Sequence, residues 1–177
     1  PSHIPNELLL PFSGQRHTED PVVIESGSGA YLQAEDGRRF YDGISSLWVA
    51  NLGHGHPTIT DAVHRQLDAV AHVTLFGQAH RPAIEVAERL PGYAGLPGYF
   101  TFLCNSGSEA VESSLKLALS YWQRMDPQSK RTKILTFHNS YHGETAGAMG
   151  ASGFDIHSDL YPGLPYQTVR VASPAIT

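Results

Sequence analysis

The stretch of chain from Tyr99 to Phe137 constrains the fold more than any other part of the sequence. Tyr99–Cys104 is aromatic and almost continuously apolar, which is typical of a buried strand. Ser108–Met125 has the periodicity of an amphipathic helix, and Lys133–Phe137 has the composition of a second strand. A strand, a helix and a strand joined in this way form a βαβ unit with parallel strands. The sequence therefore predicts an α/β protein with a mostly parallel sheet.

The remaining elements follow from shorter patterns. The turn Asp36-Gly37 between two strand-like runs is a strong hairpin signal. Pro57 and Pro82 can each open a helix, because apolar residues recur at helical spacing after both. The predicted elements are a strand at Val22–Glu25, a hairpin of Ala30–Ala34 with Arg39–Asp42, helices from Pro57 and from Pro82, and a short helix within Glu144–Gly150.

Composition excludes several function classes. The chain has 12 Lys and Arg against 17 Asp and Glu, a net charge of −5 and no basic cluster, so neither nucleic acid nor an anionic membrane is an expected partner. Cys104 is the only cysteine, which indicates a reducing compartment and a cytoplasmic location. No apolar run approaches the roughly 20 residues of a membrane-spanning helix, and Pro1–Leu10 lacks the pattern of a signal peptide.

The turn Asn105–Ser108 ends the predicted strand and opens the predicted helix. Gly107 permits a tight turn, and the free N–H groups and dipole of a helix start attract anions. Ser106 and Ser108 add hydroxyl groups, so the turn suits a phosphate dianion. The alternative is that a serine only caps the helix. The P-loop and dinucleotide fingerprints do not match, because Gly-Lys-Ser/Thr and the G-x-G-x-x-G spacing are absent.

The loop His138–Glu144 follows the next predicted strand and is expected near the same sheet edge. Tyr141 is suited to stack on a flat heteroaromatic ring, although it can instead pack in the core, with His142 as an ordinary loop histidine. His138 and His142 are spaced like metal ligands, but Asn139 stands where the zincin pattern has Glu. We therefore expect no metal site.

The segment Gly43–Pro57 is rich in Gly, Ser, His and Asn and is predicted to be a functional loop. Trp48 in this loop is either a wall of a substrate site or a core anchor. His54 and His56 form a His-x-His pattern, for which we expect no acidic partner nearby, so a glycine-rich turn into the helix from Pro57 is the alternative to a metal site.

None of the three lysines is expected to act as a nucleophile. Lys116 is predicted to pair with Glu112 on the polar face of its helix, and Lys130 and Lys133 flank an exposed basic turn. The G-x-S-x-G pattern of a nucleophilic serine is also absent.

Several motifs, taken in order, resemble the class III aminotransferases, which bind pyridoxal 5′-phosphate on the fold-type I scaffold. Within that family the chain resembles most the biotin-pathway branch that converts 8-amino-7-oxononanoate to 7,8-diaminononanoate. The family motifs are Asp36–Arg38, Tyr41–Trp48, Gly53–Pro57, Asn105–Glu112 and Ser140–Gly143, and those of the branch are Pro11–Ser13, Ala71–Gly77 and Ala118–Gln123.

The resemblance implies roles for the matching residues. The cofactor phosphate would be held by the backbone and hydroxyl of the turn, the pyridine ring would stack on the tyrosine of the second loop, and apolar side chains would wall the substrate site. The implied cofactor-binding residues are Gly107, Ser108, Tyr141 and His142, and the implied substrate-binding residues are Phe12, Leu47 and Trp48.

The resemblance also implies small-molecule partners and a homodimer. The keto acceptor would be 8-amino-7-oxononanoate. Because Leu47-Trp48 and Phe12 differ from the aromatic pair and the tyrosine common in the branch, the amino donor is either S-adenosylmethionine or lysine. The alternatives are another class III transaminase of the omega-amino acid or ornithine type, or a non-catalytic binding or dimerisation module.

Chains of this family are more than twice as long, so this chain resembles their N-terminal part. The lysine that forms the Schiff base is expected beyond Thr177, and the isolated chain is predicted to be inactive. Residues 1–56 would be an N-terminal segment with the hairpin and an active-site loop, and residues 57–177 would be the first part of the large cofactor-binding domain.

Overall fold

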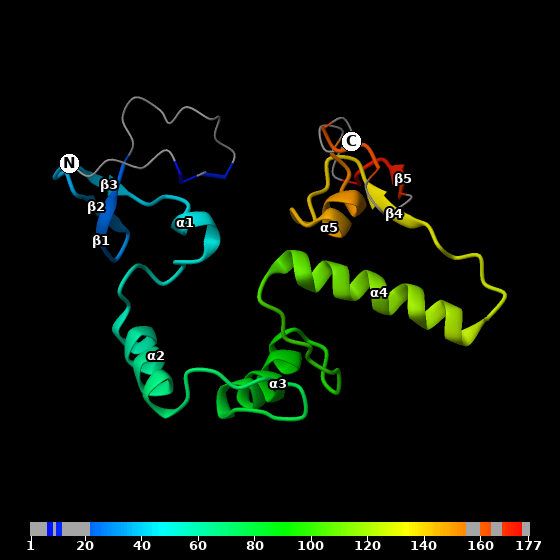
Figure 1. Ribbon diagram of the computed structural model, residues 1–177, viewed down its shortest axis with the longest axis horizontal. Helices are drawn as coiled ribbons and strands as arrows, with labels where there is room; N and C mark the ends of the chain where they lie inside the picture. Colours follow the sequence, from blue (N-terminus) through cyan, green and yellow to red (C-terminus); the bar gives the residue numbers. More distant parts are fainter. Residues whose placement is uncertain (1–6, 9, 12–21, 155–159, 164–167, 175–177) are drawn as a thin grey trace. The chain divides into compact units, whose positions relative to one another are not determined.

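A computed structural model describes residues 7–8, 10–11, 22–154, 160–163 and 168–174 (Figure 1). The chain divides into two compact units, Pro1–Ala79 and His80–Thr177. The predicted boundary between residues 56 and 57 remains a prediction for the complete protein.

The first unit contains an antiparallel sheet in the order β1 (Ile24–Ser28), β2 (Tyr31–Ala34) and β3 (Arg39–Tyr41). The predicted hairpin is confirmed, with β2 and β3 paired in antiparallel register. Gly37 closes its turn at a φ of +87°, a conformation that glycine reaches without steric cost.

Two helical segments follow the sheet. α1 (Ser45–Trp48) is a single turn, and α2 (Pro57–Ala69) is the helix predicted to begin at Pro57. The loop between them is joined to the sheet, since Gly29 and His54 exchange two backbone hydrogen bonds of 3.0 and 2.8 Å.

The second unit contains α3 (Arg81–Tyr93), α4 (Gly107–Met125), β4 (Ile134–Phe137), α5 (Ala146–Ala151) and β5 (Thr168–Val171). Three predicted helices are thereby confirmed, and α3 continues through Pro91 to Tyr93. The start of α4 is capped from both directions: Ser106 Oγ accepts from Glu109 N at 3.2 Å, and Glu109 Oε2 accepts from Asn105 N at 3.0 Å.

β4 and β5 pair in parallel, with α5 in the connection between them, so the parallel sheet is confirmed for these two strands. The predicted strand Tyr99–Cys104 is wrong for this structure. The segment pairs with no strand among the described residues, and Phe100 and Phe102 are 104% and 73% exposed. A strand depends on backbone hydrogen bonds to a neighbour, and none of the described strands lies paired beside this segment.

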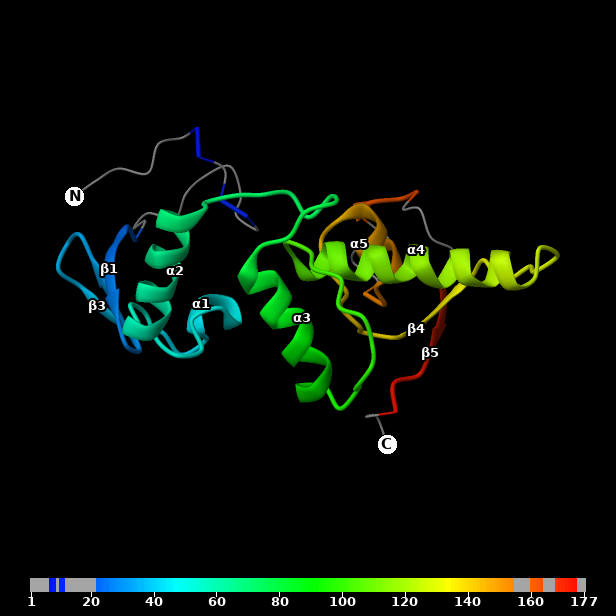
Figure 2. The same ribbon diagram turned by 90° about the horizontal axis from the view of Figure 1, so that it is seen from below.

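Burial in the second unit concentrates at α5. Figures 1 and 2 show α5 beside the N-terminal half of α4, and four of its residues, Gly147, Ala148, Met149 and Ala151, are buried. Most large apolar side chains of the described residues are exposed elsewhere. The best-packed part of this unit is therefore the region where α4 meets the loop and helix that follow β4. No helix in the described part of the chain is long and apolar enough to cross a membrane.

Candidate functional site

The first turn of α4 leaves backbone donors available. The N–H groups of Gly107 and Ser108 have no hydrogen-bond partner among the described residues, and a Cβ added to Gly107 would meet nothing within 4 Å. Ser106 is the helix cap, so the capping alternative holds for this serine and its oxygen is already engaged by Glu109. The turn thus presents two free donors at the positive end of a 19-residue helix, an arrangement that attracts an anion.

Ser108 connects this turn to the loop after β4. Its Oγ accepts a hydrogen bond from Glu144 N at 3.1 Å. Gly143 is buried at a φ of +133°, and a Cβ there would overlap Ser108 Oγ and lie 2.8 Å from Ser108 Cβ. The structure therefore brings the two predicted loops together, and the contact requires glycine at position 143.

Tyr141 lies in that loop with half of its surface exposed, so the alternative that it packs in the core is not observed. Its ring centroid is 6.3 Å from that of Phe154, at an interplanar angle of 54°. Partial desolvation, followed by a hydrogen bond with Glu144, raises the pKa of the Tyr141 phenol above its ordinary value. At neutral pH the phenol is protonated and can donate to Glu144 while one part of the ring remains accessible.

His142 is tied to the end of β4. Its backbone N donates to Ser152 Oγ at 3.0 Å, and its Nε2 lies 3.3 Å from Thr136 Oγ1. Thr136 and Ser152 are buried, and Thr136 Oγ1 is also 2.8 Å from Ser140 Oγ. These hydrogen bonds fix the backbone on both sides of Tyr141.

Glu112 also contributes to this site, although the sequence pattern predicted a different partner for it. It does not form the predicted ion pair with Lys116; its Oε1 accepts from Gly147 N at 3.2 Å. Hydrogen bonds from the Thr145 hydroxyl and then from the Gly147 and Ala148 backbone lower the pKa of Glu112, and Lys116 is the weakest cause. The reason for the difference is that α5 packs against α4 and offers backbone donors that a solvated lysine does not match.

The contact with Glu112 depends on the absence of a side chain at Gly147. A Cβ at this position would lie 2.7 Å from Glu112 Cδ. Glycine therefore lets the start of α5 approach the carboxylate closely. The only sequence signal for this contact is a glycine inside a predicted helix.

In the first unit, α1 is a left-handed turn. Ser45, Ser46, Leu47 and Trp48 have φ angles of 49°, 47°, 57° and 71°. For residues other than glycine this conformation costs roughly 1–2 kcal/mol each, so such a turn requires contacts that hold it.

Asp42 supplies such contacts. Its Oδ1 accepts from Ser46 N at 2.9 Å, and its Oδ2 accepts from Ser46 Oγ at 2.8 Å and lies 2.7 Å from His54 Nε2. The Ser46 N–H and, second, His54 lower the pKa of Asp42 to about 2. The expectation that His54 has no acidic partner is wrong, because the fold closes a separation of 12 residues that no local pattern indicates.

Leu47 and Trp48 project from this turn and are 64% and 74% exposed. The core-anchor alternative for Trp48 is therefore not observed. The third predicted substrate residue, Phe12, lies outside the described residues. Leu47 and Trp48 belong to the first unit, whereas Gly107, Ser108, Tyr141 and His142 belong to the second.

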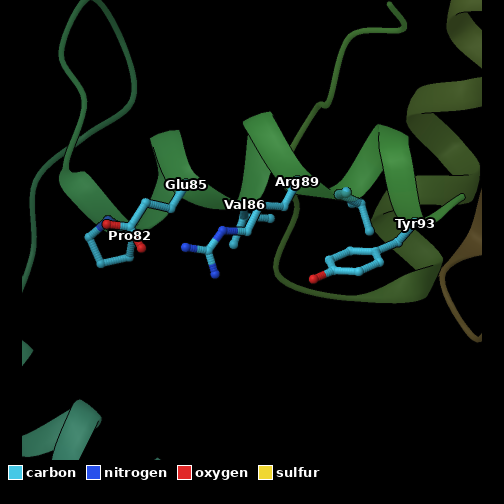
Figure 3. Close-up of a pocket in the computed structure, with 6 residues that line it drawn as sticks. Pro82, Glu85, Val86, Arg89 and Tyr93 are labelled. Atoms are coloured by element: carbon cyan, nitrogen blue, oxygen red, sulfur yellow. The ribbon is translucent and has the colours of Figure 1, made fainter. Parts of the chain in front are cut away.

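Other candidates contribute little to these sites. Lys116, Lys130 and Lys133 are exposed, and no group of three potential metal ligands gathers within the described ranges. A hollow on α3 contains none of the predicted site residues, and its lining comes from a single helix (Figure 3): Pro82, Glu85, Val86, Arg89, Leu90 and Tyr93.

Comparison with known proteins identifies the family of the chain. Residues 12–176 match the family model described as aminotransferase class-III. An adenosylmethionine-8-amino-7-oxononanoate aminotransferase from Anoxybacillus flavithermus is 40% identical over 172 residues, which are 96% of this chain and 37% of that protein. The chain spans about a third of the length of the curated relatives it matches.

Solved structures show the same likeness. An adenosylmethionine-8-amino-7-oxononanoate aminotransferase from Methanocaldococcus jannaschii has a TM-score of 0.89 at 28% identity, covering 97% of this chain and 40% of its own. An amine transaminase from an uncultivated Pseudomonas species, in the PLP-bound form, has a TM-score of 0.85 at 30% identity, covering 95% of this chain and 38% of its own.

Proposed function

Because the chain belongs to the class III aminotransferases, which use pyridoxal 5′-phosphate, we propose that it is the N-terminal part of an enzyme that aminates 8-amino-7-oxononanoate to 7,8-diaminononanoate. The observation that carries the proposal is the contact between Ser108 and Glu144, because it brings the free donors of α4 and the Tyr141 loop together. S-adenosylmethionine or lysine serves as the amino donor, and the proposed location is the cytoplasm.

The turn at α4 fits the phosphate of this cofactor. The free N–H groups of Gly107 and Ser108 can donate to phosphate oxygens, and the space above Gly107 is open. Because Ser108 Oγ accepts from Glu144 N, its own proton remains available for donation to the phosphate. The Ser108 hydroxyl can thus donate to the phosphate and accept from the neighbouring loop at the same time.

Tyr141 fits the pyridine ring of the cofactor. The exposed part of its ring can accept a flat ring by stacking. His142 holds the loop through Thr136 and Ser152, so its proposed place is beside the ring.

The substrate wall is proposed to contain Phe12, Leu47 and Trp48. The exposure of Leu47 and Trp48 supports this role, because these apolar side chains are not used in the core of the first unit. The many exposed apolar side chains of the described residues likewise support further burial in a complete homodimer.

Pyridoxal phosphate supplies the electron sink that lets an amino group move from donor to acceptor. The complete enzyme also has to provide an amine held close to the cofactor, and the three lysines of this chain are exposed. We therefore place the lysine that binds the cofactor beyond Thr177 and expect the isolated 177-residue chain to transfer no amino group.

The experiment is an assay of the full-length enzyme with pyridoxal phosphate and 8-amino-7-oxononanoate. S-adenosylmethionine and lysine are supplied separately as donors, and 7,8-diaminononanoate is measured by mass spectrometry. Product with either donor supports the proposal and identifies the donor. The likeness to an amine transaminase favours a second candidate, a transaminase of the omega-amino acid or ornithine type. Turnover of those amines without any 7,8-diaminononanoate would replace the proposal by this candidate.

A further inference from the structure

The left-handed turn Ser45–Trp48 is the least expected local structure in the described chain. Four consecutive residues have positive φ, and none of them is glycine. Backbone hydrogen bonds of 2.9 Å from Trp48 N to Ile44 O and from Val49 N to Ser45 O close the turn. A right-handed turn would offer equivalent bonds at lower cost, so these bonds alone do not explain the handedness.

The carboxylate of Asp42 does select the handedness. It binds both the backbone N–H and the hydroxyl of Ser46, the second residue of the turn, at 2.9 and 2.8 Å. Only 6% of the Asp42 side-chain surface is exposed, so little water competes for these bonds. The torsions of Ser45 set the direction of the Ser46 N–H, so if Ser45 changed to a right-handed conformation this N–H would turn away from Asp42 and the pair of bonds would be lost.

His54 in turn fixes Asp42. Its Nε2 is 2.7 Å from Asp42 Oδ2, and its backbone is bonded in both directions to Gly29. A Cβ on Gly27 would lie 2.9 Å from His54 Cβ, so the histidine is seated directly on the sheet. A continuous set of contacts therefore joins the sheet, through His54 and Asp42, to the turn.

We propose that Asp42, supported by His54, is a positioning residue that holds the Ser45–Trp48 turn left-handed and thereby presents Leu47 and Trp48 to the substrate. The proposal rests on the proposed function, in which Leu47 and Trp48 wall the substrate site. It adds that the orientation of this wall is determined by a carboxylate that does not touch substrate.

The test compares variants of the full-length holoenzyme. Asp42→Ala removes all three contacts, and His54→Gln keeps a side-chain N–H donor. Asp36→Ala is the matched control, because Asp36 is also a hairpin carboxylate that accepts a backbone N–H, but its partner is Arg38, at 3.0 Å, and not the turn. The readouts are KM for acceptor and donor, kcat, the Kd of pyridoxal phosphate, and acrylamide quenching of Trp48, isolated by subtracting the signal of a Trp48→Phe enzyme.

Asp42→Ala is expected to lower kcat/KM about tenfold or more, mainly through KM, because displaced walls orient the substrate poorly. Quenching of Trp48 should change, the Kd of the cofactor should not, and Asp36→Ala and His54→Gln should remain close to wild type. Unchanged quenching together with unchanged KM in Asp42→Ala would overturn the inference.

Rescue separates positioning from general stability. Adding Ser45→Gly to Asp42→Ala places at a left-handed position the residue that adopts positive φ without a steric penalty, so KM should partly recover. A double variant no better than Asp42→Ala would contradict the proposal. If Asp42→Ala does not fold, Asp42→Asn, which keeps one carbonyl acceptor, is measured in its place with the same expectations at smaller size.

Failure of the underlying function gives a different result. If Trp48→Leu keeps wild-type kcat/KM, the substrate wall is wrong, whereas a quenching change in Asp42→Ala would still support the role of Asp42 in holding the turn.

Discussion

Glu112 on α4 accepts a hydrogen bond at 3.2 Å from the backbone N–H of Gly147, 35 residues further along the chain. The Thr145 hydroxyl and the Gly147 and Ala148 backbone also lower the pKa of this carboxylate. It therefore joins the helix that carries Gly107 and Ser108 to the helix that follows the Tyr141 loop, and the relative position of the predicted phosphate and ring contacts depends on it.

Replacing Glu112 should loosen this junction. In the full-length enzyme, Glu112→Ala is expected to lower the Tm and weaken cofactor binding, because it leaves the buried Gly147 N–H without its acceptor. Glu112→Gln retains an acceptor oxygen and should lie between Ala and wild type. Thermal unfolding and cofactor titration check this, with the exposed Glu88 on α3 changed to Ala as control. Equal effects of Glu112→Ala and Glu88→Ala would contradict it.

The contribution of Asp42 to stability should depend on pH. Its pKa of about 2 in the fold lies below the ordinary 3.8, so the carboxylate stabilises the fold above pH 3.8 and loses this contribution as the pH falls toward 2. The difference in unfolding free energy between wild type and Asp42→Asn should therefore be constant above about pH 5 and shrink below it. Urea unfolding across this range measures the difference, with Asp61→Asn as control. A gap that persists at the acid end would refute the assignment.

Gly143→Ala should disturb the turn at α4. The new Cβ would overlap Ser108 Oγ, in addition to the cost of a positive φ. Gly95→Ala is the matched control, since Gly95 has a φ of +69° but open space around it. Cofactor titration of the apoenzyme should show a Kd raised roughly tenfold or more for Gly143→Ala only, as expected for one displaced hydrogen bond to a charged group. Similar values for both variants would show that the overlap is relieved without moving Ser108.

Ser108→Ala should weaken cofactor binding directly. Loss of one hydrogen bond to a charged group costs about 1.5–3 kcal/mol, which raises the Kd roughly ten- to hundredfold. Ser106→Ala is a useful comparison, because it removes the helix cap rather than the predicted phosphate contact. An unchanged Kd in Ser108→Ala would exclude the phosphate role.

Tyr141 should act through its ring. Tyr141→Phe keeps a stacking surface and loses only the phenol hydroxyl, whereas Tyr141→Ala loses the surface as well. The Ala variant is expected to retain cofactor more weakly than the Phe variant on dilution or dialysis. Equal retention would indicate that the residue packs against Phe154 and does not support the cofactor.

Local patterns were sufficient for the elements that local contacts stabilise. The hairpin follows from Asp36-Gly37, and α4 follows from its periodicity and from the Ser106 and Glu109 cap. The segment Tyr99–Cys104 shows the limit, because apolar composition indicates a capacity to form a strand but cannot supply the neighbouring strand.

In the candidate site, too, the residues that follow from local patterns were predictable and the contacts between distant residues were not. Gly107 and Ser108 lie in the first turn of a helix that the sequence pattern predicts. The position of the Tyr141 loop beside them follows from the order of the predicted elements. The contacts of Glu112 with Gly147 and of Asp42 with His54 were not predictable, because these partners lie 35 and 12 residues away and no spacing rule connects them. The left-handed turn was hidden for a further reason: Ser45 and its neighbours adopt a conformation that their own preferences oppose.

The turn at Ser45–Trp48 also has a consequence for chirality. Its backbone is the mirror image of an ordinary helical turn, so the conformation that is unfavourable for an L-amino acid is the preferred one for its enantiomer. Position 45, whose side chain makes no hydrogen bond among the described residues, is a place where a D-serine introduced by chemical ligation would suit the backbone better than the encoded residue. In this short segment the L-configuration of the residues disfavours the left-handed backbone, and the hydrogen bonds of the Asp42 carboxylate offset that cost.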